Sequence, residues 1–124
     1  MENERGKLIG YYVYQSPTKT LCLPYESILF MESEGHMLHI YTNDENGHYR
    51  IRQSLDQATD ELPGDCFVRC HRGYIVNVAF VCSVQNGMIL LRNNQTVPIG
   101  RAWKANFAAG LSAFCETRKE IREE

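Results

Sequence analysis

The chain has 124 residues, a hydrophobic fraction of 44%, a charged fraction of 23% and a formal net charge of −2. These values predict one globular domain over 1–124, large enough to bury a core without disulfide bonds. No stretch approaches the roughly 18 apolar residues of a membrane helix, and the N-terminus lacks the apolar segment of a signal peptide, so we expect a cytoplasmic protein.

The first half of the chain is predicted to form short strands. Each expected strand is either rich in β-branched and aromatic residues, alternating in polarity, or continuously apolar. The turn cluster Asn43–Gly47 predicts that the last two of these strands form a hairpin. The expected strands are 7–16, 20–24, 27–33, 36–42 and 48–52.

Residues 54–63 break this pattern and predict a short helix. Ser54 can cap it, and apolar residues then recur at helical spacing until Pro63 and Gly64 end it. Extended segments return afterwards, with Asn86 and Gly87 marking a hairpin turn. These expected strands are 67–70, 74–84, 88–92 and 96–100.

A terminal helix is expected over residues 101–121. Its apolar residues Trp103, Phe107, Leu111 and Phe114 follow one another at steps of four, four and three, which places them on one helical face. The fold is therefore predicted to be mainly β, with one short inserted helix and a C-terminal helix.

Charge is unevenly distributed along the chain. Residues 1–65 carry eleven acidic and five basic residues, and residues 116–124 carry four and three. Residues 66–115, by contrast, contain no Asp or Glu, and their basic residues are Arg69, Arg72, Arg92, Arg101 and Lys104. Such asymmetry predicts a positive surface for an anionic partner, although a core-rich half with incidental arginines gives the same pattern.

Neither a metal site nor a catalytic centre is expected. The cysteines are odd in number and without regular pairing, so in a cytosolic chain they are interpreted as reduced thiols. They include no Cys-x-x-Cys pair, and no second pair of ligands follows at zinc-finger spacing. The acid-free segment offers no carboxylate to orient His71, and Cys70 beside it would point to the opposite face of a strand. No glycine-rich phosphate loop is present, so no cofactor is expected. The five cysteines are Cys22, Cys66, Cys70, Cys82 and Cys115.

The basic side chains of predicted loops are the better candidates for a site. Gly73 is expected to break the strand alternation and release His71 and Arg72 into a loop. Arg101 follows Gly100 at the entrance of the last helix, where backbone N–H groups favour anions. An arginine there can fork onto a guanine edge or a phosphate, although solvated loop arginines are common.

These residues carry a resemblance to a known family. The segment 67–77, a preceding turn that contains His36, and a glycine and arginine before the last helix resemble the LytTR family. Its members are DNA-binding output domains of bacterial response regulators, and the resemblance runs from about residue 8 to residue 110. The matching central residues are Phe67, Arg69, His71, Tyr74, Ile75, Val76 and Asn77.

The resemblance implies elongated antiparallel sheets that bind double-stranded DNA through loops in successive major grooves. The carried-over base-reading positions are His36, Arg72 and Arg101. His71 and Gly73 would flank the central contact, and Lys104 would lie near a phosphate. Tyr74 and Asn77 would support the loop, since a buried Asn can satisfy backbone groups.

The resemblance also implies two copies on promoter direct repeats, and a receiver or sensory domain if the chain is a fragment. Gly73 and Gly100 stand where the family often has serine, which removes two possible hydroxyl contacts. Two alternatives stay open: a β-rich interaction module for an acidic protein partner, and a redox sensor in which Cys70 is activated by neighbouring bases. DNA binding predicts that the loops around 36, 72 and 101 converge on one face.

Overall fold

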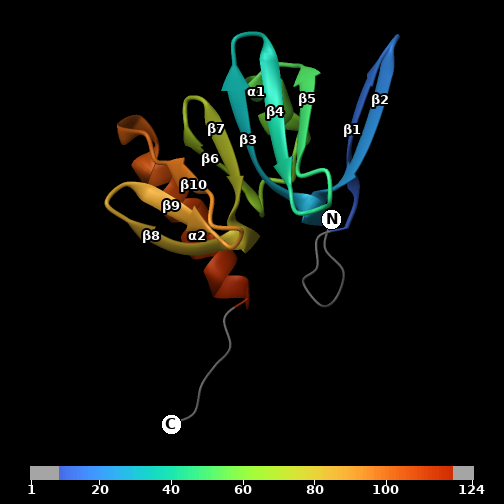
Figure 1. The fold of residues 1–124 in the computed structure, drawn as a ribbon. Helices are drawn as coiled ribbons and strands as arrows, with labels where there is room; N and C mark the ends of the chain where they lie inside the picture. The colour runs from blue at the N-terminus through green and yellow to red at the C-terminus, as the bar shows by residue number, and fades with distance from the viewer. Residues whose placement is uncertain (1–8, 119–124) are drawn as a thin grey trace.

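The computed structural model describes residues 9–118, which form ten strands, three short 3-10 turns and two α-helices (Figure 1). The strands are β1 (Tyr11–Ser16), β2 (Lys19–Pro24), β3 (Ile28–Glu34), β4 (Met37–Thr42), β5 (His48–Arg52), β6 (Phe67–His71), β7 (Tyr74–Asn77), β8 (Val81–Gln85), β9 (Met88–Leu91) and β10 (Thr96–Pro98). The helical elements are η1 (Tyr25–Ser27), α1 (Leu55–Glu61), η2 (Val78–Phe80), η3 (Arg101–Trp103) and α2 (Lys104–Arg118).

The strands form three antiparallel sheets that lie side by side (Figure 1). A β1–β2 hairpin stands at one end, the five-stranded sheet β5–β4–β3–β7–β6 is in the middle, and the three-stranded sheet β10–β9–β8 is at the other end. The prediction of a mainly β fold with an inserted helix and a C-terminal helix is confirmed. Among the described residues, no helix is long and apolar enough to cross a membrane.

Two hydrophobic cores hold the sheets together. The first lies between the β1–β2 hairpin, one face of the central sheet and α1, and includes Tyr12, Leu38 and Leu55. The second joins the central sheet to the three-stranded sheet and α2, and includes Val76, Ile89 and Phe107. An isolated two-stranded hairpin such as β1–β2 is marginally stable at best, so its packing in the first core holds it against the central sheet.

The inserted helix forms as its sequence predicts. The Ser54 side chain accepts a hydrogen bond from the backbone N–H of Gln57 at 3.0 Å, which satisfies one of the free donors of the first turn. Leu55 and Ala58 are buried on its inner face. The chain leaves the helix at Leu62 in an extended conformation, immediately before Pro63.

The strand expected over 74–84 is wrong, because the chain changes sheets in the middle of it. It divides into β7, the η2 turn and β8. The cause is Asn77, whose side-chain oxygen accepts a hydrogen bond from the N–H of Ala79 at 3.0 Å and caps η2. Hydrophobic periodicity alone cannot detect this break, since the residues on both sides of it are apolar.

The C-terminal helix is entered through the η3 turn and packs on β6. Phe107 is buried, while Leu111 and Phe114 pack at the edge of the second core. The expected residues 119–121 lie outside the described part of the chain. Gly110 permits this packing, because a Cβ atom there would lie 2.5 Å from Cγ2 of Val68 on β6.

Candidate nucleic-acid interface

Three turns that are far apart in sequence lie in a row along one edge of the molecule (Figure 1). The N–H of Ser33, at the end of β3, donates to the carbonyl of Gly73 in the β6–β7 turn at 2.9 Å. The N–H of Gly100 donates to the carbonyl of Cys70 on β6 at 2.8 Å. The row therefore runs from the turn with His36, through the turn with Arg72, to the segment with Arg101.

Four basic side chains of this row are exposed. His36 occupies the β3–β4 turn, Arg72 the β6–β7 turn, Arg101 the η3 turn and Lys104 the start of α2. Within residues 9–118, none of these four side chains makes a hydrogen bond or an ion pair. Because no protein acceptor holds them, their donors are available to an external anion.

Arg69 differs from these four basic residues because its side chain is only 12% exposed and is held by hydrogen bonds, an ion pair and a ring contact. Its Nε donates to the carbonyl of His71 at 2.9 Å, and its Nη2 donates to the carbonyl of Arg72. Its Nη1 pairs with Asp56 of α1 at 2.9 Å, and its guanidinium lies over the ring of Trp103. Arg69 therefore fixes the backbone of the central turn and leaves the side chain of Arg72 free.

His71 is the last residue of β6, so the expectation that Gly73 releases it into a loop is wrong for this residue. A register shift between Arg69 and His71 breaks the alternation earlier, and His71 pairs with Tyr74 across the hairpin. Its Nδ1 accepts the N–H of Gly73 at 3.0 Å. In the neutral ring the proton is then assigned to Nε2, which is the atom left for an outside acceptor.

The same imidazole ring packs closely against the third turn of the row. A Cβ atom at Gly100 would lie 3.2 Å from Cδ2 of His71 and 3.2 Å from Cδ1 of Trp103. A serine at this position would need its neighbours to shift by a few tenths of an ångström. The glycine therefore lets the Arg101 segment approach the central turn closely.

The two residues expected to support the loop lie at opposite ends of β7. The Tyr74 hydroxyl, next to the turn, donates to the carboxylate of Glu32 at 2.7 Å. Asn77 is buried and satisfies backbone groups, since its Nδ2 donates to the carbonyl of Ile28 at 2.9 Å and its Oδ1 accepts from Ala79. Asn77 therefore holds the junction with η2, at the end of β7 remote from the turn.

The thiol of Cys70 does not have the environment of a redox sensor. Its side chain is fully buried, and this burial raises its pKa from the ordinary value of 9.0 to about 12, despite the opposing charge of Arg69. Burial likewise raises the pKa of Cys66 to about 11. In the described part of the chain, no three His, Cys, Asp or Glu side chains are grouped so as to hold a metal ion.

Three residues that hold the row of turns in place were not among the expected site residues. Arg69 was a matching family position without a role, and Trp103 was expected only as an apolar residue of the last helix. Asn106 of α2 completes the group, because its Nδ2 donates to the carbonyl of Arg69 at 2.8 Å. A sequence signal existed for Arg69 alone, since a charged residue in a largely apolar strand needs partners.

Three antiparallel sheets with a row of basic turns along one edge define a β-rich module that presents basic side chains from its turns. A sequence model of the LytTr DNA-binding domain matches residues 18–112. The chain therefore belongs to the LytTr family of DNA-binding domains.

A solved structure supports the fold. It is described as the LytTr DNA-binding domain of a methyl-accepting/DNA response regulator from Bacillus cereus. It superposes with a TM-score of 0.70 at 20% sequence identity, covering 82% of this chain and 96% of that one. No curated protein is significantly similar to the chain in sequence.

Proposed function

We propose that this chain is a sequence-specific double-stranded DNA-binding domain of a bacterial transcription regulator, and that it places loops in successive major grooves. The observation that carries the proposal is the row of three turns along one edge, which presents exposed basic side chains that have no hydrogen-bond or ion-pair partner among the described residues. The family is one of DNA-binding domains, which supports DNA over an acidic protein as the anionic partner. The proposed activity is binding, without a catalytic step.

Each basic side chain of the row has a proposed part in DNA binding. Arg72 and Arg101 fork onto guanine edges, the pairing that discriminates by about 1–3 kcal/mol for each good bidentate contact. His36 reads a base from the first turn, and the Nε2 of His71 reaches a phosphate. Lys104, on the first turn of α2, contacts another phosphate and adds to the salt dependence of binding.

Gly73 contributes its small size in this proposal. Its N–H is already donated to His71, so it is not a phosphate ligand, but the absent side chain lets the backbone approach the duplex. Two copies are proposed to bind a promoter direct repeat, each through its own row of turns. If the chain is a fragment of a longer protein, a receiver or sensory domain in that protein would control how much of the DNA site is bound.

The experiment is a fluorescence-anisotropy titration over a salt series. The probe is a labelled duplex of about 30 base pairs, roughly three helical turns, enriched by the wild-type protein from a random-sequence pool. Arg72→Ala and Arg101→Ala are compared with Arg92→Ala, an exposed arginine of the same acid-free segment beyond the opposite end of β9.

We expect Arg72→Ala and Arg101→Ala each to weaken specific DNA binding at least about fivefold, and Arg92→Ala to leave it unchanged. Equal effects of the three substitutions would remove the assignment of Arg72 and Arg101. If the wild-type protein enriches no sequence and binds no duplex at low salt, the DNA-binding proposal fails. The protein-interaction alternative would then replace it.

A further inference from the structure

A fourth turn lies at the same edge as the row. Asn86 and Gly87 join β8 to β9, and the carbonyl of Gly87 accepts the N–H of Ile99 at 2.9 Å. Met88 at the start of β9 is paired with Pro98 at the end of β10, so this turn and the Arg101 segment leave the three-stranded sheet together. The β8–β9 turn therefore extends the row beyond Arg101.

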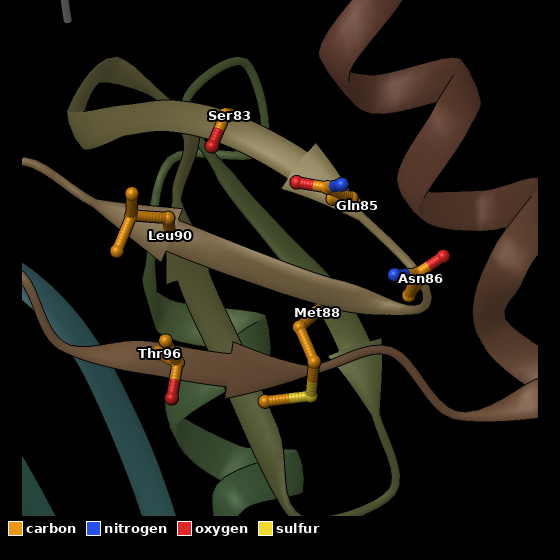
Figure 2. Close-up of a pocket in the computed structure, with 6 residues that line it drawn as sticks. All are labelled: Ser83, Gln85, Asn86, Met88, Leu90 and Thr96. Atoms are coloured by element: carbon orange, nitrogen blue, oxygen red, sulfur yellow. The ribbon is translucent and has the colours of Figure 1, made fainter.

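The side chains of this turn are free to bind. Gln85 and Asn86 are exposed, and neither carboxamide has a hydrogen-bond partner within residues 9–118. Figure 2 shows Asn86 at the tip of the turn, with Gln85 at the end of β8 and Met88 at the start of β9 beside it. The backbone of Asn86 is left-handed, with φ of 53°, and the tight turn fixes where its side chain leaves the chain.

The electrostatic surroundings suit a polyanion. The hollow beside the turn is lined by uncharged side chains, namely Ser83, Gln85, Asn86, Met88, Leu90 and Thr96. The turn also lies within the segment 66–115, which contains no Asp or Glu. A phosphate backbone held by Arg101 would therefore meet no carboxylate from this hairpin.

We propose that the β8–β9 turn is a fourth DNA-contacting segment, in which the carboxamide of Asn86 hydrogen-bonds an adenine edge next to the base contacted by Arg101. A carboxamide carries one acceptor and two donors, and this pattern matches N6 and N7 of adenine. This inference rests on the proposed function, because it assumes that the row of turns faces DNA.

Asparagine is also favoured at turn positions with positive φ for conformational reasons alone. A second asparagine of the chain allows that explanation to be tested. Asn94 is exposed, has φ of 72°, and lies in the β9–β10 turn at the opposite end of β9. The two asparagines share residue type, backbone conformation and sheet. They differ in which edge of the molecule they occupy.

The first test removes each carboxamide without backbone strain, by Asn86→Gly and Asn94→Gly, since glycine accepts positive φ. With the enriched duplex as probe, we expect Asn86→Gly to weaken binding about tenfold and Asn94→Gly to have no effect. The slope of affinity against salt should not change, because a neutral amide displaces no counterion. A second enrichment with Asn86→Gly should lose the adenine preference at one position.

The second test adds a charge at each position, by Asn86→Lys and Asn94→Lys, and its readout does not depend on losing stability. If the β8–β9 turn faces DNA, Asn86→Lys should tighten binding to an unselected duplex and steepen the salt slope by about one unit. Asn94→Lys should do so much less, because that lysine would lie on the far edge. Equal effects of the two lysines would contradict the placement of Asn86 against DNA.

The outcomes separate this inference from the proposed function. If the wild-type protein binds and Arg101→Ala weakens binding, but Asn86→Gly behaves like Asn94→Gly, the fourth contact is overturned and the proposed function stands. If affinity falls in Asn86→Gly while the enriched sequence is unchanged, the adenine contact is overturned. If the wild-type protein binds no DNA, both proposals fail together.

Discussion

The guanidinium of Arg69 lies over the ring of Trp103, with 5.0 Å between its Cζ atom and the ring centroid. This contact joins the strand before the central turn to the η3 turn that carries Arg101. The same guanidinium donates to the carbonyls of His71 and Arg72. One side chain thereby couples the positions of two of the three turns proposed to face DNA.

Replacement of Arg69 by lysine should therefore impair DNA binding. Lysine cannot donate to two carbonyls in a fixed fork while it also covers the indole ring. We expect Arg69→Lys to weaken specific binding about tenfold, in a protein that is still folded by circular dichroism and thermal unfolding. Asp56→Asn is the control, because the Asp56 side chain is 88% exposed and such ion pairs contribute about 0–1 kcal/mol. A larger loss of DNA affinity in Asp56→Asn than in Arg69→Lys would contradict this role.

Gly110→Ala should destabilise the fold. Alanine is the better helix former by about 1 kcal/mol, but its Cβ would lie 2.5 Å and 2.8 Å from the two methyl carbons of Val68. We expect a net loss of about 1–3 kcal/mol in the free energy of unfolding, measured with urea. Val68→Ala should partly rescue the variant, so that the two substitutions are not additive. Additive losses would show that the helix does not pack on Val68 at this point.

Asn77→Ala should reduce stability without changing the specificity of DNA binding. The substitution leaves the buried carbonyl of Ile28 without its partner, which costs about 1–3 kcal/mol. The N–H of Ala79, which is only partly buried, also loses its acceptor, and water can replace it in part. Chemical denaturation measures this loss. Because Asn77 lies at the end of β7 remote from the central turn, the folded variant should enrich the same DNA sequence as the wild-type protein.

Alkaline pH should destabilise the protein through its buried thiols. The pKa values of Cys66 and Cys70 are raised to about 11 and about 12 in the folded state, against 9.0 for an ordinary thiol. As the pH rises, the thiols of the unfolded chain therefore lose their protons before those of the folded protein. The contribution of the two buried thiols to the free energy of unfolding is fully present below about pH 9 and is lost as the pH rises above it. The limiting slope is about 1.4 kcal/mol per pH unit for each thiol.

Urea denaturation between pH 8 and pH 11 measures this dependence. We expect Cys70→Ala to flatten it, whereas Cys22→Ala, which changes an exposed thiol, should leave it unchanged. Native-state labelling with a thiol reagent at pH 8 should modify the exposed Cys22, Cys82 and Cys115 rapidly and the two buried thiols slowly. Rapid labelling of Cys70 would restore the redox-sensor alternative.

The sequence by itself determined most of the local elements, although not the break between β7 and β8, because their signals come from neighbouring residues. Alternating polarity over 37–42 produced β4, with Leu38 and Ile40 facing the core. Ser54 capped α1, and the Asn86–Gly87 pair formed a hairpin turn. The resemblance to a known family added the expected basic positions, each of which is exposed or half-buried on the row of turns.

Only the tertiary structure decided which turns lie together and which charges are free. The contact between Ser33 and Gly73, and that between Gly100 and Cys70, depend on how strands from distant parts of the chain pair. Pairing across such distances is fixed by the burial of whole sheet faces, which no local pattern records. For the same reason the sequence places both Arg69 and Arg72 in the acid-free segment, but only the fold shows that the first is engaged in its own turn and the second is exposed.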